Sequence, residues 1–193
     1  MQEQDLESFF AYDNHPEHTR HLSRNAYSRD EAREFIETQR TMDLGTEGEY
    51  HHLSVELRST GEMIGTVCIK VTSQRHRQGD IGWFLDARHQ GRGYATEASR
   101  AMLQFGFANL HLHRMTAVCH ATNARSFLMM ERLGMRREAC FVHATYFDGQ
   151  WHDQYAYAIL KAEWVQSAST EESILSSSLS GESLPPANEP GWE

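Results

Sequence analysis

The residues that most directly indicate chemistry form a short glycine-rich segment, Gln90–Thr96, with the sequence Q-G-R-G-Y-A-T. A Walker phosphate loop needs glycine, lysine and then serine or threonine, which this segment lacks. A dinucleotide fingerprint beginning at Gly91 needs a glycine in place of Thr96, and no acidic ribose anchor follows on a convincing second strand. Small residues between a strand and a helix do let backbone N–H groups and a helix N-terminus approach a pyrophosphate. We therefore interpret the segment as an acyl-CoA loop.

The elements around this loop must place it between a strand and a helix. An apolar run over 80–85 predicts the strand, and apolar residues at helical spacing over 94–109, with the small Gly106 among them, predict the helix. Further elements are predicted by capping boxes, alternation and turn residues. They are helices at about 3–11 and 29–43, strands at 51–57 and 63–71, a strand at 113–121, a helix from near Thr122 or Asn123 to Gly134, and a closing hairpin of 135–146 and 151–160 with a type I′ turn at Asp148-Gly149. Their order predicts an α/β fold with a sheet of mixed direction.

Composition predicts one globular domain and a tail. The 193 residues are 39% hydrophobic and 23% charged, which suffices for one sizeable core, and we place that domain at 1–166. Residues 167–193 hold eight serines and five glutamates but no lysine or arginine. This composition predicts a disordered acidic, serine-rich tail.

Charge and patterning argue against several classes of partner. The net charge of −9 opposes binding to a nucleic-acid backbone. No apolar run approaches the roughly 18–20 residues of a membrane span, and the first residues lack the order of a signal peptide. The three cysteines are odd in number, widely spaced and without a C-x-x-C pair. We therefore expect a cytoplasmic protein with no nucleic-acid or membrane partner.

Four motifs occur in a fixed order between residues 80 and 157, and the resemblance that they support runs over about 5–164. They are Asp80-Ile81-Gly82-Trp83-Phe84-Leu85, Gln90-Gly91-Arg92-Gly93-Tyr94-Ala95, Asn123-x-x-Ser126 leading to Leu133-Gly134-Met135, and Asp148-Gly149-Gln150-Trp151-x-Asp153 before Tyr157. Through them the sequence resembles the GNAT N-acetyltransferase superfamily, and specifically its ribosomal-protein alanine N-acetyltransferase-like (Rim-type) branch. Four ordered motifs are far more specific than one loop.

The resemblance implies a mixed, mostly antiparallel, splayed sheet flanked by helices, with acetyl-CoA as co-substrate and no metal. The acyl-CoA would lie between the strands at 80–86 and 114–121. Backbone groups of Phe84, Leu85 and Asp86 would hold its pantetheine arm. The segment near its pyrophosphate would consist of Gln90, Gly91, Arg92, Gly93, Tyr94, Ala95 and Thr96. Arg92 either adds charge there or is an ordinary surface residue.

Acetyl transfer to an amine needs a neutral nucleophile, a polarised carbonyl and a proton for the departing thiolate. Many family members place a tyrosine acid seven residues after the asparagine, where this chain has Met130. The nearest candidate acid is Ser126, because the Rim-type branch carries a serine there, and the alternative is that its hydroxyl caps the helix. Asn123 would bind the pantetheine or order a water, or it is simply the N-cap.

The candidate base is Asp80, at a place where several family members have a glutamate. The Rim-type branch also uses a carboxylate on the strand after the serine helix, but residues 142–145 offer none, which leaves His143 as a substitute. An α-amine with a pKa of ~8 is partly neutral at pH 7, so a weak or water-relayed base suffices for it. The tightest histidine pair, His111-x-His113, has no third ligand at matching spacing, so we expect no metal.

One departure from the family concerns the start of the sheet. Family members usually open with a strand, whereas here Met1 leads almost directly into the first helix. We expect that first strand to be missing, so either the start lies upstream or the sheet has an exposed edge that can pair with another chain, for example in a homodimer.

The predicted function is transfer of an acetyl group from acetyl-CoA to a primary amine, either a protein N-terminus or a small molecule. One alternative keeps the fold but uses a longer acyl-CoA. The other is a CoA-binding module without turnover, motivated by Met130 at the acid position and by the missing carboxylate near Thr145.

Overall fold

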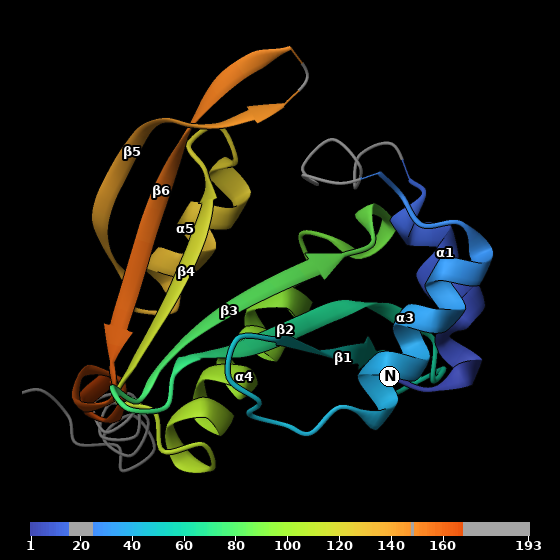
Figure 1. Cartoon of the computed structure of the whole chain (residues 1–193), viewed down its shortest axis with the longest axis horizontal. Coiled ribbons are helices and arrows are strands. Elements are labelled where there is room, and N and C mark those ends of the chain that lie inside the picture. Colours follow the sequence, from blue (N-terminus) through green and yellow to red (C-terminus); the bar gives the residue numbers. More distant parts are fainter. Residues whose placement is uncertain (16–24, 148, 168–193) are drawn as a thin grey trace, which may run out of the picture.

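The computed structural model describes residues 1–15, 25–147 and 149–167. Its elements surround one six-stranded sheet (Figure 1). In chain order they are η1 (Glu3–Asp5), α1 (Leu6–Asp13), α3 (Arg29–Thr41), β1 (Tyr50–Glu56), β2 (Met63–Ser73), β3 (Gln78–Leu85), η2 (Ala87–His89), α4 (Tyr94–Ala108), β4 (Arg114–His120), α5 (Ala124–Arg132), β5 (Arg136–Phe147) and β6 (Gln150–Leu160). Residues 161–167 are also helical, which the sequence patterns did not predict. Apart from Ser167, the predicted tail lies outside the described residues, as does Asp148 of the predicted turn.

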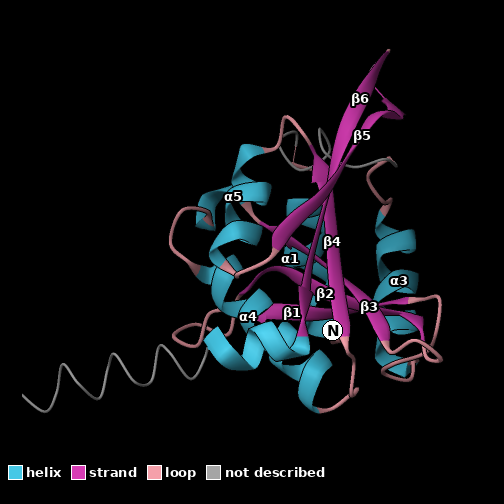
Figure 2. Ribbon diagram, turned by 90° about the vertical axis from the view of Figure 1, so that its left-hand side faces the viewer, coloured by secondary structure: helices cyan, strands magenta, loops and turns pink. Residues whose placement is uncertain are grey.

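The sheet has the strand order β1-β2-β3-β4-β6-β5. All neighbouring strands are antiparallel except β3 and β4, which are parallel. Figure 2 shows the hairpin of β5 and β6 projecting beyond the helices. The prediction of an α/β fold with a mixed, mostly antiparallel sheet flanked by helices is confirmed.

Each face of the sheet is covered by its own helices, as the alternation of side chains along β3 requires. Ile81 packs into a core with Leu103 of α4 and Met130 of α5. Phe84, three residues further, packs on the opposite face against a second core that contains Phe9 of α1. Helices α4 and α5 therefore lie on one face, and α1 and α3 lie on the other.

Local signals set several element boundaries. Ser28 and Glu31 form the predicted capping box at the start of α3, because each side chain accepts a hydrogen bond from the other residue's N–H. Helix α5 ends before Gly134, which has φ +79°. Gly106 allows α4 to approach the sheet closely, since a Cβ there would lie 2.5 Å from Sδ of Met115. These signals explain why the predicted element order agrees with the structure.

In the described part of the chain no strand precedes β1, and β1 and β5 form the two edges of the sheet. The strand with which family members usually open is therefore not among these residues. None of the described helices is long and apolar enough to cross a membrane.

Candidate active site

The site is built around a gap between two neighbouring strands. β3 and β4 pair only through Gln78–Asp80 and Arg114–Thr116. Beyond these residues β3 remains paired with β2 as far as Leu85, and β4 remains paired with β6 as far as His120. The strands therefore separate like the arms of a V (Figure 1), and their facing edges pair with no other described strand. Backbone N–H and C=O groups of both edges are available to a ligand in the gap.

Two glycines shape the loop that follows β3. Gly91 and Gly93 have φ of +76° and +85°, a left-handed conformation that side chains disfavour. Gly93 is the N-cap of α4, and its carbonyl accepts the first helical hydrogen bond from the Glu97 N–H at 3.0 Å. The N–H groups of the first helical turn therefore have no partner within the helix and carry the positive end of its dipole. A Cβ on either glycine would meet no atom within 4 Å, so an anion has room to approach.

The backbone between β3 and this loop is partly used within the chain. The Leu85 carbonyl accepts a hydrogen bond from Nε2 of Gln90 at 2.9 Å, and the Asp86 N–H donates to the Ile64 carbonyl at 2.9 Å. Burial raises the pKa of the Asp86 carboxyl, but its hydrogen bonds and ion pair with Arg88 outweigh burial and lower it. These contacts hold the end of β3 and the start of the loop in a fixed position.

Asp80 lies where the two strands part and is 8% exposed. The Tyr50 hydroxyl on β1 donates to its Oδ1 at 2.6 Å, and the Thr116 hydroxyl on β4 donates to its Oδ2 at 2.7 Å. Burial raises the pKa of Asp80, while the two hydroxyls and the charge of Lys70 partly offset that effect. Asp80 thus links three strands at the closed end of the gap.

This environment leaves Asp80 able to accept a proton. Each carboxylate oxygen has a second lone pair, so one further hydrogen bond from a water or an amine can be accepted. Burial and the Asp80 charge raise the pKa of Tyr50, so the phenol stays protonated and is a poor acid. Tyr50 and Thr116 were not predicted as site residues, because only the register of the four strands β1 to β4 brings them to Asp80.

Helix α5 brings Asn123 and Ser126 to the other strand of the gap. Asn123 is the N-cap of α5, and its Oδ1 accepts from the Ser126 N–H at 3.1 Å. The half-buried Ser126 hydroxyl lies beside the thiol of Cys119 near the end of β4. Burial raises the pKa of Cys119 more than the neighbouring Ser126 hydroxyl lowers it. The capping interaction of Asn123 is therefore present, and Cys119 is a neighbour of Ser126 that the motifs did not indicate.

Asp80 and Ser126 approach the gap from opposite faces of the sheet. Asp80 shares its face with Thr116 and with Phe84, which packs toward α1. Cys119 is three residues beyond Thr116 and lies in the opposite core under α4 and α5, where Ser126 contacts it. A thioester in the gap would therefore have the carboxylate on one side and the hydroxyl on the other.

Three histidines lie on β4, β5 and β6. His143 is exposed at an irregular position of β5, with φ +50°, and its N–H donates to Oδ1 of Asp153 at 2.8 Å. His120 and His152, on β4 and β6, have ring centroids 5.6 Å apart, a pairing that the sequence did not reveal. Among the described residues no group of three or more His, Cys, Asp or Glu side chains is placed to hold a metal ion.

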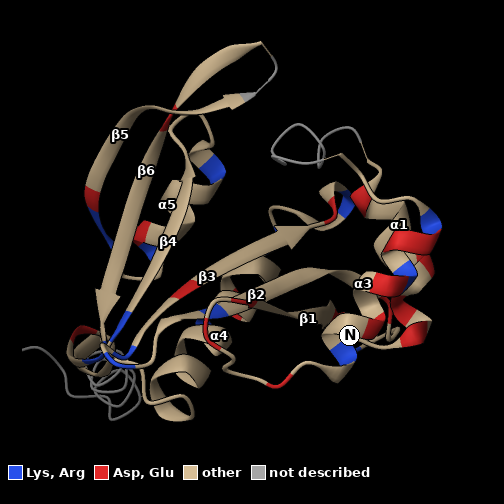
Figure 3. Ribbon diagram, viewed as in Figure 1, with Lys and Arg blue, Asp and Glu red and all other residues tan. Residues whose placement is uncertain are grey.

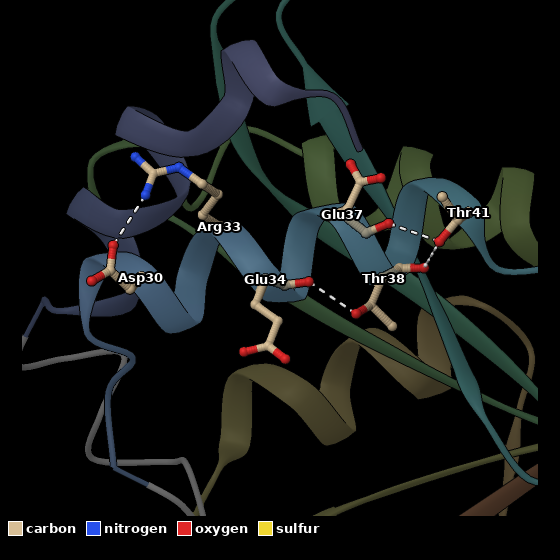
Figure 4. A pocket seen from close by; sticks show the side chains of 6 residues that line it. All are labelled: Asp30, Arg33, Glu34, Glu37, Thr38 and Thr41. Carbon is tan, nitrogen blue, oxygen red and sulfur yellow. Dashed lines mark hydrogen bonds and ion pairs between the residues drawn. The ribbon is translucent and has the colours of Figure 1, made fainter.

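A groove of about 450 Å³ lies on the solvent-facing side of α3 (Figure 4). Figure 3 shows that acidic residues gather on α1 and α3. Arg33 is paired with Asp30 in this groove, and Glu37 is paired with Arg40. The groove lining consists of Asp30, Arg33, Glu34, Glu37, Thr38 and Thr41. Because its charged groups largely neutralise one another, we assign this groove no part in the reaction.

Comparison with known proteins decides the family. Residues 1–136 match the acetyltransferase (GNAT) domain family. YnaD from Bacillus subtilis strain 168, an uncharacterised N-acetyltransferase, is 30% identical over 160 residues, which are 83% of this chain and 90% of YnaD. The chain belongs to the GNAT acetyltransferase family. The superfamily resemblance of the sequence is thereby confirmed, and this GNAT protein is an acyltransferase that transfers acetyl groups.

Other relatives bear on the fold and on the branch. A GNAT acetyltransferase structure from Bacillus anthracis has a TM-score of 0.73 and 27% identity, covering 84% of this chain and 92% of that one. A spermidine N-acetyltransferase from Vibrio cholerae, in complex with CoA and spermine, has a TM-score of 0.74 over 86% and 95% of the two chains, but its 20% identity supports the fold alone. YdaF from Bacillus subtilis, provisionally described as a ribosomal N-acetyltransferase, is 31% identical over 54% of this chain and 57% of YdaF.

Proposed function

We propose that this GNAT acetyltransferase transfers the acetyl group of acetyl-CoA to a primary amine, either a protein N-terminal α-amine or an amine of a small molecule. The observation that carries the proposal is the gap between β3 and β4, which ends at the N-terminus of α4. Acetyl-CoA is a long molecule with amide groups along its arm and a pyrophosphate beyond them. The open strand edges match the arm, and the helix N-terminus matches the pyrophosphate. We place the enzyme in the Rim-type branch, which its motifs resemble.

Different residues along the gap would bind different parts of acetyl-CoA. The arm would lie along the edge of β3 that ends at Phe84–Asp86, with Asn123 on the opposite side. The loop residues Gly91 and Gly93 leave room for the phosphates at the first N–H groups of α4. Arg92 is exposed beside these groups and adds positive charge.

The reaction proceeds by direct attack. The amine nitrogen attacks the thioester carbonyl carbon, so a C–N bond forms and the C–S bond breaks. Asp80 takes the proton that the amine loses, directly or through a water, because its carboxylate is held at the closed end of the gap. Ser126 gives its hydroxyl proton to the thiolate from the opposite face, and CoA leaves as the thiol. Water then returns a proton to Ser126 and takes up the proton held by Asp80. An α-amine suits this arrangement, since it is partly neutral at pH 7.

One observation favours the alternative of a CoA-binding module without turnover. Met130, at the position of the tyrosine acid in many family members, is 1% exposed within the core under α5. The Met130 thioether is enclosed by this core and has no proton to give. The same gap with an enlarged apolar end would fit the other alternative, a longer acyl-CoA.

Turnover assays on the purified full chain test these alternatives. The protein is incubated with acetyl-CoA, or with a longer acyl-CoA, and a panel of peptides with free α-amines, small amines and polyamines, and release of free CoA thiol is measured. Thiol release with acetyl-CoA and an amine is the expected result. Release only with the longer donor supports a transferase that uses a longer acyl-CoA. Tight CoA binding without release supports a CoA-binding module without turnover.

A homodimer belongs to the same proposal. β5 is an edge strand, and its side chains Phe141 and Val142 are 51% and 71% exposed. Pairing with a second copy would cover both the strand edge and these apolar side chains. Sedimentation equilibrium of the full chain is expected to give twice the monomer mass of 22.2 kDa.

A further inference from the structure

A side-chain bridge crosses the open end of the gap. Gln90, the first residue of the glycine loop, donates from Nε2 to the Leu85 carbonyl at 2.9 Å. Its Oε1 accepts a hydrogen bond from Nη1 of Arg125 at 2.6 Å. Because the amide end faces a carbonyl and the oxygen end faces a guanidinium, both ends of the glutamine are used and its orientation is fixed. The bridge joins the end of β3 to the first turn of α5.

This bridge lies at the opposite end of the gap from Asp80. At the closed end, β3 and β4 are linked through the side chains of Asp80 and Thr116. At the open end, the loop after β3 and the helix after β4 are linked through Gln90 and Arg125. Arg125 is therefore held beside the loop whose backbone N–H groups face an anion site.

The charge of Arg125 is not neutralised at this position. Gln90 is a neutral partner, and within the described ranges Arg125 forms no ion pair. Arg88, which lies on the same loop, differs because its guanidinium donates to both oxygens of Asp86. A guanidinium has five N–H donors, so Arg125 keeps several for another acceptor. In a chain with a net charge of −9, an arginine without a counter-ion beside this loop is suited to an anionic ligand.

We propose that Arg125 is a phosphate-binding residue for the CoA substrate and that Gln90 is the positioning residue that holds its guanidinium at the loop. This inference rests on the proposed function, because it assigns a further residue to the same site. The phosphate is either the pyrophosphate or the 3′-phosphate of CoA, which present the same chemistry to a guanidinium.

Calorimetric titration of the full-length variants with three ligands tests the proposal. The ligands are CoA, 3′-dephospho-CoA, which lacks only the 3′-phosphate, and pantetheine, which lacks all phosphates. For Arg125→Ala we expect the Kd for CoA to rise about 10- to 100-fold, as for the loss of a hydrogen bond between charged groups. Arg125→Lys should lose less, because the positive charge remains, and Gln90→Ala should lose an intermediate amount. An equal loss with 3′-dephospho-CoA identifies the pyrophosphate, and no loss with it identifies the 3′-phosphate.

The matched control is Arg132→Ala, which removes the same charge from the exposed last turn of the same helix. It should leave the Kd for CoA within twofold of the wild type. The proposal is overturned if Arg125→Ala behaves like this control, or if Arg125→Ala weakens pantetheine as much as CoA, since the bridge would then act only through the shape of the gap. Melting temperatures of all variants show whether each one is folded. If the wild type itself binds no CoA, the proposed function fails, and this inference fails with it.

Discussion

Asp80 offers the sharpest test of the proposed chemistry, because replacing it with asparagine preserves the shape of the site and removes its charge. In Asp80→Asn the amide oxygen can accept from the Tyr50 hydroxyl, as Oδ1 does now at 2.6 Å. The amide nitrogen can donate to Oγ of Thr116, and that hydroxyl can then donate to the Gly79 carbonyl, from which it is separated by 3.1 Å. Every hydrogen bond at the closed end of the gap thus has a replacement.

The expected changes in stability and in kcat follow from the hydrogen bonds that each variant keeps or loses. Because no polar group loses its partner, the free energy of unfolding of Asp80→Asn should stay within about 1 kcal/mol of the wild-type value. Asp80→Ala should cost about 1–3 kcal/mol, because the half-buried Tyr50 hydroxyl loses its acceptor. If Asp80 is the base, kcat of Asp80→Asn should fall about 10²–10⁴-fold.

The pH dependence gives a second measure with a definite sign. Burial raises the pKa of Asp80 in the folded protein above its usual value of 3.8, so folding favours the protonated form. The wild type therefore loses stability as pH rises from about 4 to the raised pKa, and Asp80→Asn lacks this loss. The kcat/KM of the wild type should rise with pH across the same interval, since the base acts only when ionised, and this limb should be absent in the variant.

Steady-state kinetics from pH 4 to 9 and urea unfolding of the wild type and both variants provide the assay. A kcat for Asp80→Asn within fivefold of the wild-type value would refute the role of Asp80 as base. A loss of stability in Asp80→Asn as large as that in Asp80→Ala would refute the exchange of hydrogen bonds.

Three further predictions concern other parts of the chain. Gly93→Asp should raise the Kd for CoA, measured by calorimetry, by at least 100-fold, because the introduced carboxylate would occupy the N–H groups of α4. Gly93→Asn has the same backbone strain and no charge, so it should lose much less affinity for CoA. Equal losses of affinity would contradict the anion site. Ser126→Ala should lower kcat about 10²–10⁴-fold if the hydroxyl protonates the thiolate, while Cys119→Ala, which removes only the neighbouring thiol, should retain kcat. A drop below tenfold in the serine variant would remove Ser126 from the reaction. Truncation after Ser167 should leave the melting temperature nearly unchanged. By contrast, Trp164→Ala should destabilise the fold by about 3–5 kcal/mol, because Trp164 is 6% exposed and its indole N–H donates to Gln104 at 2.8 Å. A large fall in melting temperature on truncation would show that the tail is structural.

Most of the fold could be predicted because its signals are local. The Ser28 capping box, the alternation along β1, the β-branched residues of β2 and the glycine after α5 at Gly134 are each signals within a few residues. The helix at 161–167 was missed because its anchor is Trp164, which packs near Phe107 from a distant part of the sequence. The spacing of apolar residues over 161–167 does not indicate that contact.

The candidate site could be predicted only where one motif spans it. The glycines at 91 and 93 reveal the loop, because the conformation that they adopt is unusual for other residues. The partners of Asp80 depend on strand register, since Tyr50 and Thr116 are 30 and 36 residues away. Arg125 meets Gln90 only because β4 leads into α5 beside the loop after β3. Contacts of this kind follow from topology, which no single motif encodes.

The separation of β3 from β4 explains why this fold suits a thioester. A sheet that closed completely would use its backbone groups on its own strands, whereas here residues 81–85 and 117–120 pair on one side only. A ligand with amide groups along its length can take the place of a strand between β3 and β4. Its amides can form hydrogen bonds with the unpaired backbone N–H and C=O groups of both strand edges, as a strand would. Polar links at Asp80 and at Gln90 fix the two ends of the gap. In the proposed function, an acyl-CoA with its phosphates at the loop would have its thioester toward Asp80, so the division of the sheet would position the reacting carbonyl.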